Sequence, residues 1–213
     1  ALLAGVAERV GIAIQQADAK EELIALSRTD SLTGLYNRRA FVESVEQIIE
    51  ARSKSGHRAA LIYVDLNNFK SVNDTFGHIQ GDAALKAAAQ LMADSAQADD
   101  LVGRIGGDEF ALWLEVEDQA EAEKRAADLA ELSQGLSEYS KDLPAPFGMA
   151  IGIALFEPDS DEEIDELFAR ADHAMYAAKR DAEQKFILAP PADKVAPQMA
   201  RNIETERSDG AVR

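Results

Sequence analysis

The stretch RIGGDEFAL, residues 104–112, interrupts an apolar segment with two glycines followed by two adjacent carboxylates. The apolar residues on both sides predict short strands over residues 101–105 and 110–114. Two strands joined across a glycine pair are typical of a β-hairpin. The fold is therefore expected to contain a hairpin with acids at its tip.

The glycines and the acids of this turn have separate uses. Gly106 and Gly107 lack a Cβ, so we expect the turn to adopt positive φ and to let a phosphate or a base approach the backbone. Asp108 and Glu109 then place two carboxylates over that surface. A solvated hairpin tip whose acids serve solubility has the same local composition, so the rest of the chain must decide between the two interpretations.

A second acid follows a buried strand. The run at residues 59–64 is uniformly apolar and ends on Asp65, where the backbone leaves the core. If the hairpin lies beside this strand, Asp65, Asp108 and Glu109 converge at one edge of the sheet. Their mutual repulsion must be relieved by protonation, by a basic side chain or by a cation, and Mg²⁺ is the natural candidate.

The stretch VDLNNFKSVNDTFGHIQGD, residues 64–82, follows that strand directly. The turn Asn68, Phe69 and Lys70 offers successive backbone N–H groups and a cation to a triphosphate, as nests and helix starts do. The chain has no GxxxxGK[ST] motif, so a triphosphate must be held by a device other than a P-loop.

Polar side chains further along this stretch suit a purine base. Asn73 and Asp82 could read its edge, because an amide both donates and accepts while a carboxylate accepts from the paired N–H donors of guanine. Each could instead cap a helix, and Asp82 fits an N-cap before an alanine-rich segment. His78 either orients the nucleotide loop or caps a turn, whereas His57 and His173 are expected to be ordinary surface residues.

The order of the remaining segments predicts the fold class. We expect helices over residues 38–52, 82–96, 118–139 and 161–180, and a further strand over residues 146–156 that is broken by Gly148 and Gly152. Helices alternating with single strands and a hairpin predict an α/β sandwich with a mixed sheet, rather than a doubly wound βαβ fold.

Composition restricts the partners. The 213 residues are 46% hydrophobic and carry a formal net charge of −17, which opposes binding to nucleic acid or to an anionic membrane surface. Apolar runs are too short to span a bilayer, so membrane insertion is not expected. The absence of cysteine excludes disulfides and thiolate metal sites and favours a cytoplasmic setting.

Both ends of the chain differ from its centre. Apolar residues at spacings of three and four predict an amphipathic helix over about residues 1–28. We expect a connecting helix that pairs between two chains and carries a signal, although packing on its own domain gives the same pattern. The start has neither an initiator methionine nor a basic leader, so we expect a longer protein. Three prolines and many charges after residue 189 predict a mobile tail.

Four motifs together resemble a known family. They are DSLTGLYNRR at residues 30–39, the stretch at 64–82, RIGGDEF at 104–110 and RADHAMYAAK at 170–179. In this order they resemble the GGDEF domain of diguanylate cyclases. The resemblance implies a palm-like mixed β-sheet flanked by helices over residues 30–188, between a connecting helix at 1–29 and a tail at 189–213. The helix itself weakly resembles the end of a GAF-type sensor, which implies an upstream sensor domain.

The resemblance also implies an activity and a set of roles. Two GTP molecules would condense into cyclic di-GMP with release of two pyrophosphates, in a homodimer in which each chain holds one GTP. Two Mg²⁺ ions per half-site, with Mn²⁺ as the alternative, would be held by Asp65, Asp108 and the Leu66 carbonyl. The phosphates would be bound by Asn68, Phe69, Lys70 and Lys179 near Gly106 and Gly107. Guanine would be bound by Asn73 and Asp82 with His78 nearby. Asp108 or Glu109 would assist deprotonation of the 3′-hydroxyl.

Three departures from the family pattern have consequences. Asn67 stands where many members have an aspartate, although Asp65 and Asp108 still suffice for the metal. Residues 181–184, DAEQ, replace the usual basic Gly-Arg-Asn stretch, which removes a phosphate contact and weakens the expected GTP binding. Residues 97–100, QADD, lack the arginine of the family's Arg-x-x-Asp feedback site, so we expect weak or absent product inhibition.

Two other functions remain open from the sequence. A catalytically silent module that binds GTP or cyclic di-GMP and regulates a partner would share the binding residues. A coiled-coil assembly device would depend on residues 1–28 alone. The carboxylates Asp65, Asp108 and Glu109 favour the enzyme over both.

Overall fold

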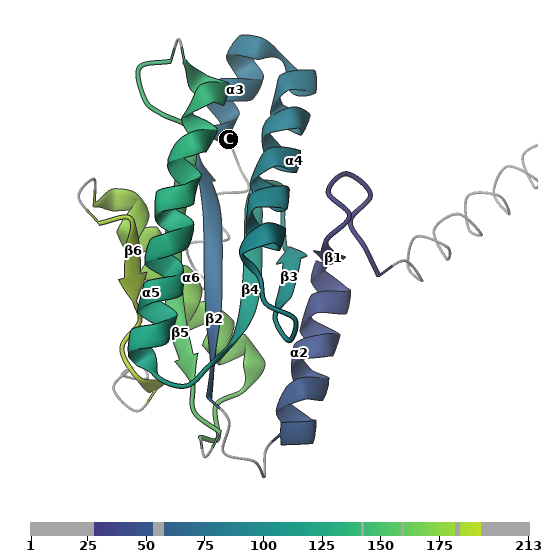
Figure 1. The fold of residues 1–213 in the computed structure, drawn as a ribbon, viewed down its shortest axis with the longest axis vertical. Helices are drawn as coiled ribbons and strands as arrows, with labels where there is room; N and C mark the ends of the chain where they lie inside the picture. The colour runs from purple at the N-terminus through teal and green to yellow at the C-terminus, as the bar shows by residue number, and fades with distance from the viewer. Residues whose placement is uncertain (1–27, 53–57, 142, 159, 182–183, 193–213) are drawn as a thin grey trace, which may run out of the picture.

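A six-stranded β-sheet forms the centre of the chain, and helices cover both of its faces (Figure 1). The computed structural model describes residues 28–52, 58–141, 143–158, 160–181 and 184–192. In chain order the elements are β1 Tyr36–Asn37, α2 Arg38–Arg52, β2 Arg58–Asn67, α3 Phe69–Phe76, α4 His78–Ser95, β3 Leu101–Arg104, β4 Glu109–Val116, α5 Gln119–Leu132, the 3₁₀ helix η1 Ser133–Ser140, β5 Gly148–Phe156, α6 Ile164–Arg180 and β6 Phe186–Leu188. The expected connecting helix at 1–29, the tail at 189–213 and His57 fall largely or wholly outside the described residues.

The sheet is mixed, as the element order predicts. Its strand order is β1-β3-β4-β2-β5-β6. The central strand β2 is antiparallel to both β4 and β5, and β3 forms the expected antiparallel hairpin with β4. The edge strands β1 and β6 pair in parallel with β3 and β5. The prediction of a palm-like mixed sheet flanked by helices is confirmed.

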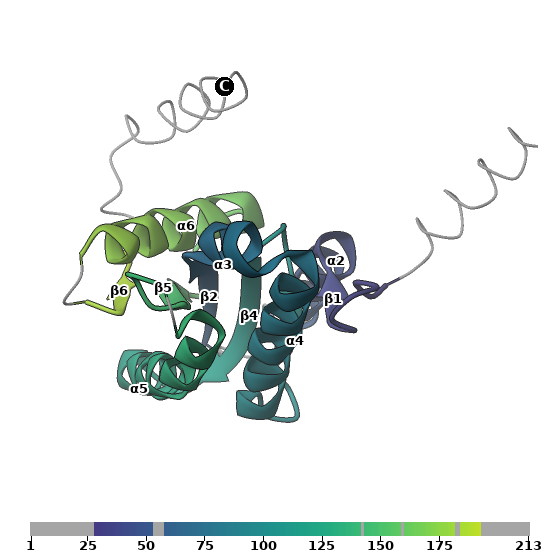
Figure 2. The ribbon, with the colours of Figure 1, turned by 90° about the horizontal axis from the view of Figure 1, so that it is seen from above.

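The central strand supplies two separate cores because its side chains alternate between the faces. Ala60, Ile62 and Val64 pack with apolar residues of α3, α4 and α5. Leu61 and Tyr63 pack on the opposite face with residues of α2 and α6. Figure 2 shows α4 and α5 on one side of the sheet and α2 and α6 on the other. The residue two positions after Tyr63, Asp65, therefore belongs to the face that α6 covers.

Helix α6 lies unusually close to the sheet because β5 has a glycine beneath it. A Cβ on Gly152 would collide with the backbone of Ala171 and Met175. A capping box between Glu163 and Glu166 fixes the start of this helix. Neither Gly148 nor Gly152 breaks β5, contrary to the expectation from sequence. Gly152 instead leaves the space that α6 needs to pack closely on the strand.

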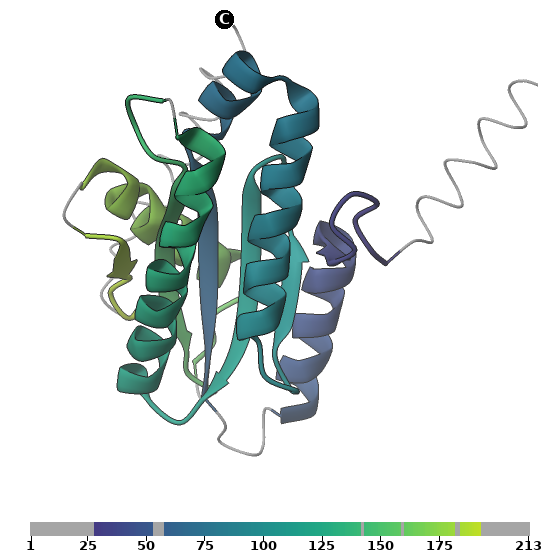
Figure 3. The same ribbon diagram turned by 45° about the horizontal axis from the view of Figure 1, so that its top comes forward.

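Three predicted helices have wrong boundaries, and the smallest difference is in α6, which begins at Ile164 rather than at 161. The segment at 118–139 divides into α5 and the 3₁₀ helix η1, where Ser133, Gly135 and Ser137 are poor α-helix formers. Helix α4 begins at His78 rather than at 82, directly after α3, and the two helices meet near one end of the sheet (Figure 3). Asp82 consequently lies inside a helix and is not an N-cap. In the described part of the chain, no helix is long and apolar enough to cross a membrane.

Candidate functional site

The end of β2 lies directly beside the glycine hairpin. In the ladder between β2 and β4, Asp65 is the partner of Glu109. One residue further on, the Leu66 N–H donates to the Asp108 carbonyl at 3.1 Å. Asp65, Leu66 and Asp108 are therefore brought together, as their positions in the sequence lead one to expect.

A lysine from α6 reaches the same place. Lys179 Nζ lies 2.6 Å from Asp65 Oδ1, and Asp65 is only 8% exposed. The lysine occupies the last turn of α6, where a cation is also favoured by the helix dipole. Lys179 is thus positioned by the packing of α6, and it offsets part of the negative charge that the sheet gathers at this end.

The carboxylates of the site are held close enough to disturb one another. Burial raises the pKa of Asp108, and the charge of Asp65 raises it further, although Lys179 opposes this. Raised carboxylate pKa values mean that the charged forms lack full compensation from the protein itself. A cation placed between Asp65 and Asp108 would supply that compensation.

Glu109 has different surroundings from its neighbour. Burial raises its pKa, and the charges of Asp172 and Asp65 raise it further, while a hydrogen bond with Tyr63 lowers it. Burial also raises the pKa of the Tyr63 hydroxyl, as does the charge of Glu109. Within the described ranges, no three His, Cys, Asp or Glu side chains are arranged to hold a metal ion. The three carboxylates nevertheless meet at one edge of the sheet, as expected: Asp65 is the ladder partner of Glu109, and the charges of Asp65 and Asp108 both raise the pKa of Glu109. Because Glu109 is also hydrogen-bonded with Tyr63, Asp65 and Asp108 are the candidate metal donors.

The remaining donors nevertheless fit a magnesium ion. Mg²⁺ is usually bound through one or two carboxylates, with the phosphates of a substrate and water completing its six ligands. Asp65 and Asp108 are two such carboxylates, side by side and incompletely neutralised. The protein thus offers the partial donor set that a substrate-bound Mg²⁺ requires.

The two glycines of the turn are not equivalent. A Cβ on Gly106 would collide with the Glu109 carboxylate, whereas one on Gly107 would meet nothing within 4 Å. Gly107 is also exposed, so the surface above it is open to a ligand. The expected positive φ is wrong for both, since the positive-φ glycines among the described residues are Gly34 and Gly77. The turn uses glycine for space rather than for backbone conformation.

The loop after β2 has an uncommon backbone conformation. Asn68 lies in the left-handed region at φ 63°, and its Nδ2 donates to the Pro146 carbonyl at 2.7 Å. Helix α3 begins at the next residue, so the N–H groups of Phe69 and Lys70 belong to a first turn, which lacks intrahelical acceptors. The loop presents backbone donors and the exposed Lys70 at the same end of the sheet as Asp65.

The corner between α3 and α4 brings the predicted base-binding residues near one another. Gly77, at φ 83°, turns the chain sharply between the two helices. The Asn73 side chain lies so close to Gly81 that a Cβ there would collide with its amide oxygen. Asp82 follows Gly81 on the exposed side of α4, and His78 is the exposed first residue of that helix. His173 is exposed on α6, as expected.

Sequence reasoning missed several contributors. Tyr63 and Asp172 surround Glu109, and Arg104 holds the backbone of the turn. Of these, only Arg104 has a visible signal, because a charged residue stands directly before the turn. Asp100, from the stretch QADD, has a structural role: its side chain is 1% exposed and forms an ion pair with Arg125 at 2.6 Å.

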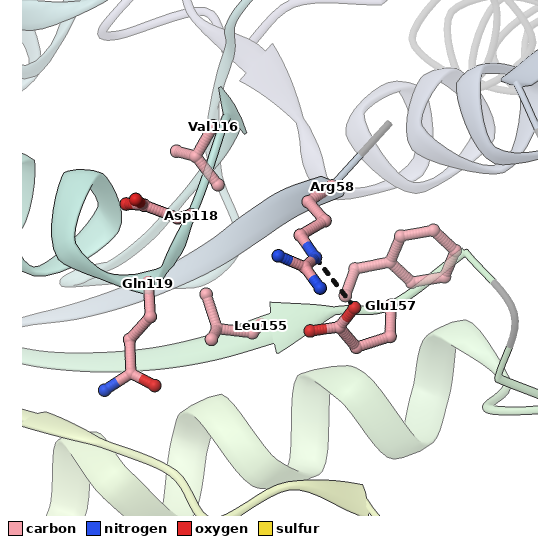
Figure 4. A pocket seen from close by; sticks show the side chains of 7 residues that line it. Arg58, Val116, Asp118, Gln119, Leu155 and Glu157 are labelled. Atoms are coloured by element: carbon pink, nitrogen blue, oxygen red, sulfur yellow. Dashed lines mark hydrogen bonds and ion pairs between the residues drawn. The ribbon is translucent and has the colours of Figure 1, made fainter. Parts of the chain in front are cut away.

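A hollow of about 300 Å³ lies at the other end of the sheet. Arg58 and Val116, which are partners at the start of β2, line it together with Gln119 and Glu157. Figure 4 shows the ion pair between Arg58 and Glu157, two of the residues that line it. Seven ladder positions separate this end of β2 from Asp65. The hollow therefore forms no part of the acidic site.

The fold and the site together define an α/β domain whose sheet gathers acidic side chains at one end, beside an open glycine turn. The family description "Diguanylate cyclase, GGDEF domain" matches residues 27–185. The chain belongs to this family.

Relatives and solved structures agree with that assignment. The chain is 32% identical over 199 residues to the diguanylate cyclase DgcP of Escherichia coli (strain K12), covering 90% of this chain and 56% of that protein. It is 36% identical over 168 residues to the bifunctional diguanylate cyclase/cyclic di-GMP phosphodiesterase MucR of Pseudomonas aeruginosa, covering 79% and 24%. The GGDEF domain of YfiN, also named TpbB, from Pseudomonas aeruginosa is 32% identical with a TM-score of 0.68, covering 81% of this chain and 99% of that one. The chain thus spans 56% of the length of DgcP and 24% of the length of MucR.

Proposed function

We propose that this chain condenses two molecules of GTP into cyclic di-GMP and releases two pyrophosphates. The observation that carries the proposal is the meeting of Asp65 and Asp108 beside the open surface at Gly107. Membership of the GGDEF family supports the same reaction. We assign the reaction to the cytoplasm, where GTP is available.

Metal binding falls to the two incompletely neutralised carboxylates. Asp65 and Asp108, with the Leu66 carbonyl, would hold two Mg²⁺ ions per half-site, and Mn²⁺ is the alternative ion. When bound, the metal withdraws charge from the phosphate oxygens and lowers the pKa of the attacking 3′-hydroxyl. The protein's part is to fix the carboxylates on a rigid strand and hairpin, so that no reorganisation is needed during the reaction.

The triphosphate is held from two sides. The backbone N–H groups of Asn68, Phe69 and Lys70, together with the Lys70 ammonium, bind the β- and γ-phosphates. Lys179 approaches from α6, beside Asp65, and would bind the same phosphates. Gly106 and Gly107 keep the floor of the site free of side chains.

Guanine is recognised at the corner between α3 and α4. The Asn73 amide can donate and accept, whereas Asp82 accepts from the N1–H and N2–H₂ donors of guanine, a pair that adenine lacks. His78 lies at the start of the same helix and orients the loop. The 3′-hydroxyl proton is taken by Asp108 or Glu109, both of which have a raised pKa.

A second copy of the chain completes the reaction. Each site holds one GTP, and each 3′-hydroxyl attacks the α-phosphate held by the partner, so a single chain cannot close the ring. An upstream sensor would control whether the two half-sites meet, through a shift in population between dimer geometries.

Turnover tests the proposal. The 213-residue chain is incubated with Mg²⁺ and GTP, and cyclic di-GMP is measured by chromatography for the wild type, Asp65→Asn and Asp108→Asn. We expect product from the wild type and its loss in both variants, with the fold retained by circular dichroism. Tight GTP binding without product would identify a silent regulatory module, and persistent turnover in both variants would refute the ligand assignment.

A further inference from the structure

Arg104 joins the glycine turn to the segment that leads into the domain. Its Nε lies 3.1 Å from each of the Gly106 and Gly107 carbonyl oxygens, and its Nη2 lies 2.6 Å from that of Gly107. Its Nη1 donates to Asp30 Oδ1 at 3.1 Å. The Arg104 and Asp30 side chains are only 14% and 23% exposed. One guanidinium therefore contacts two parts of the chain that are 74 residues apart.

Holding these two carbonyls fixes the orientation of the turn. In a trans peptide the C=O of one residue and the N–H of the next point in opposite directions. Because Arg104 binds the Gly106 and Gly107 carbonyls, the N–H groups of Gly107 and Asp108 must face away from it. Backbone hydrogen bonds from Ile105 and Gly106 to the Glu109 carbonyl, and from Leu66 to the Asp108 carbonyl, hold the two ends of the turn. Arg104 orients the two peptide units between them, where glycine would otherwise allow wide backbone freedom.

Asp30 is itself held in a closed loop, residues 30–35, which we call the leading loop. Its Oδ1 accepts from the Thr33 N–H at 2.9 Å and from the Thr33 hydroxyl at 2.7 Å. Two backbone hydrogen bonds, Asp30 N–H to Leu35 and Gly34 N–H to Asp30, close the loop. Burial would raise the pKa of Asp30, but the Thr33 and Arg104 hydrogen bonds lower it overall. Asp30 is thus a fixed anchor rather than a mobile surface acid.

The backbone makes a second link between the same two regions. Strand β1, which follows the leading loop, pairs with β3 so that Asn37 is the partner of Arg104. Arg104 is therefore linked to this region through its main chain and through its side chain. A displacement of the chain at Arg28, the first described residue, would reach the turn through a few hydrogen-bonded residues.

We propose that Arg104, anchored by Asp30, is a positioning residue for the reaction and couples the leading loop to the orientation of the Gly106–Gly107 turn. The proposal rests on the proposed function, because the positioned group is the turn that carries Asp108. Misplacement of a reacting group by about 1 Å can cost on the order of 100-fold in rate. The contact therefore acts on turnover more than on substrate binding.

Two variants and one control test this coupling in the full chain. Arg104→Lys keeps the charge, but a lysine cannot bridge two carbonyls and a carboxylate in one plane. Asp30→Asn keeps an oxygen for Thr33 and removes the ion pair. Arg58→Gln removes an exposed ion pair with Glu157 at the other end of β2 and leaves the turn untouched. Hydrogen exchange of residues 105–109 without nucleotide, kcat and KM are measured for each.

We expect faster exchange at 105–109 in both variants, a fall in kcat of about 10- to 100-fold, and a KM within about threefold of wild type. The double variant should be no worse than Arg104→Lys alone, since both remove one shared contact. Unchanged exchange with unchanged kcat, or effects that simply multiply in the double variant, would overturn the coupling. Exchange is read without catalysis, so a wild type that makes no product would refute the proposed function and leave this test standing.

Discussion

Gly152 allows the packing of α6 on the sheet to be tested most directly. A Cβ on this residue would meet backbone atoms of Ala171 and Met175, including Met175 Cα at 2.9 Å. Because these are main-chain atoms, Gly152→Ala can be accommodated only if α6 moves away from β5. Overpacking of this kind costs about 1–3 kcal/mol. For a domain of this size the Tm should fall by roughly 2–12 °C.

The same substitution should impair the site from a distance. Helix α6 carries Lys179, whose Nζ lies 2.6 Å from Asp65. A shift of the helix separates this pair, so cyclic di-GMP formation should fall even at temperatures where the variant is fully folded. Gly148→Ala is the matched control, because a Cβ at that position of β5 meets nothing within 4 Å.

The two readouts are thermal unfolding followed by circular dichroism, and product formation at 20 °C below the lower Tm, a margin of at least about 5 kcal/mol. We expect Gly148→Ala to unfold within about 2 °C of wild type, which corresponds to less than about 1 kcal/mol. An equal Tm for Gly152→Ala and Gly148→Ala would refute the close approach of α6 to β5.

Further predictions concern buried charge, pH and feedback. Arg125→Ala removes the cation beside the Asp100 carboxylate, which is 1% exposed and keeps backbone N–H donors from Gln97 and Glu115. The free energy of unfolding in urea should fall by about 1.5–3 kcal/mol, against little change for Lys124→Ala. The folded-state pKa of Asp108 is raised, so protonation of this carboxyl stabilises the fold and the contribution is lost as pH rises. In metal-free buffer, Asp108→Asn should therefore raise the Tm at pH 7. A gain in Tm that persisted below pH 3.8 would contradict this. Because Gln97 replaces the feedback arginine and Asp100 is engaged by Arg125, added cyclic di-GMP should leave the initial rate unchanged, and inhibition at micromolar product would contradict this.

The sequence predicted the parts of the fold that depend on local patterning. The apolar run ending at Asp65 and the glycine hairpin were both identified, because a continuous buried strand and a two-strand turn each leave a short-range signal. The edge strands β1 and β6 were missed, since two or three residues are too few to show a periodicity. Their pairing depends on the sheet edges that the rest of the fold provides.

The acidic residues of the site were predicted from the sequence, but the side chains that surround them were not. Asp65 and Asp108 could be brought together by topology alone, because strand ends and hairpin tips meet at sheet edges. Arg104 and Tyr63 could not be placed, because their roles depend on side-chain directions and on contacts with distant residues. The conformation of the turn was misjudged for the same reason: Gly106 is small because the Glu109 carboxylate lies over it.

The dependence of turnover on protein concentration tests the central claim most directly. Cyclic di-GMP formation per chain is measured at saturating GTP and Mg²⁺ while the 213-residue chain is diluted, and Asp108→Asn serves as the blank. Two facing half-sites require the rate per chain to fall on dilution, as the dimer dissociates. A constant rate per chain above the blank, at dilutions where the chain sediments as a monomer, would show that one chain closes the ring by itself, which contradicts the account.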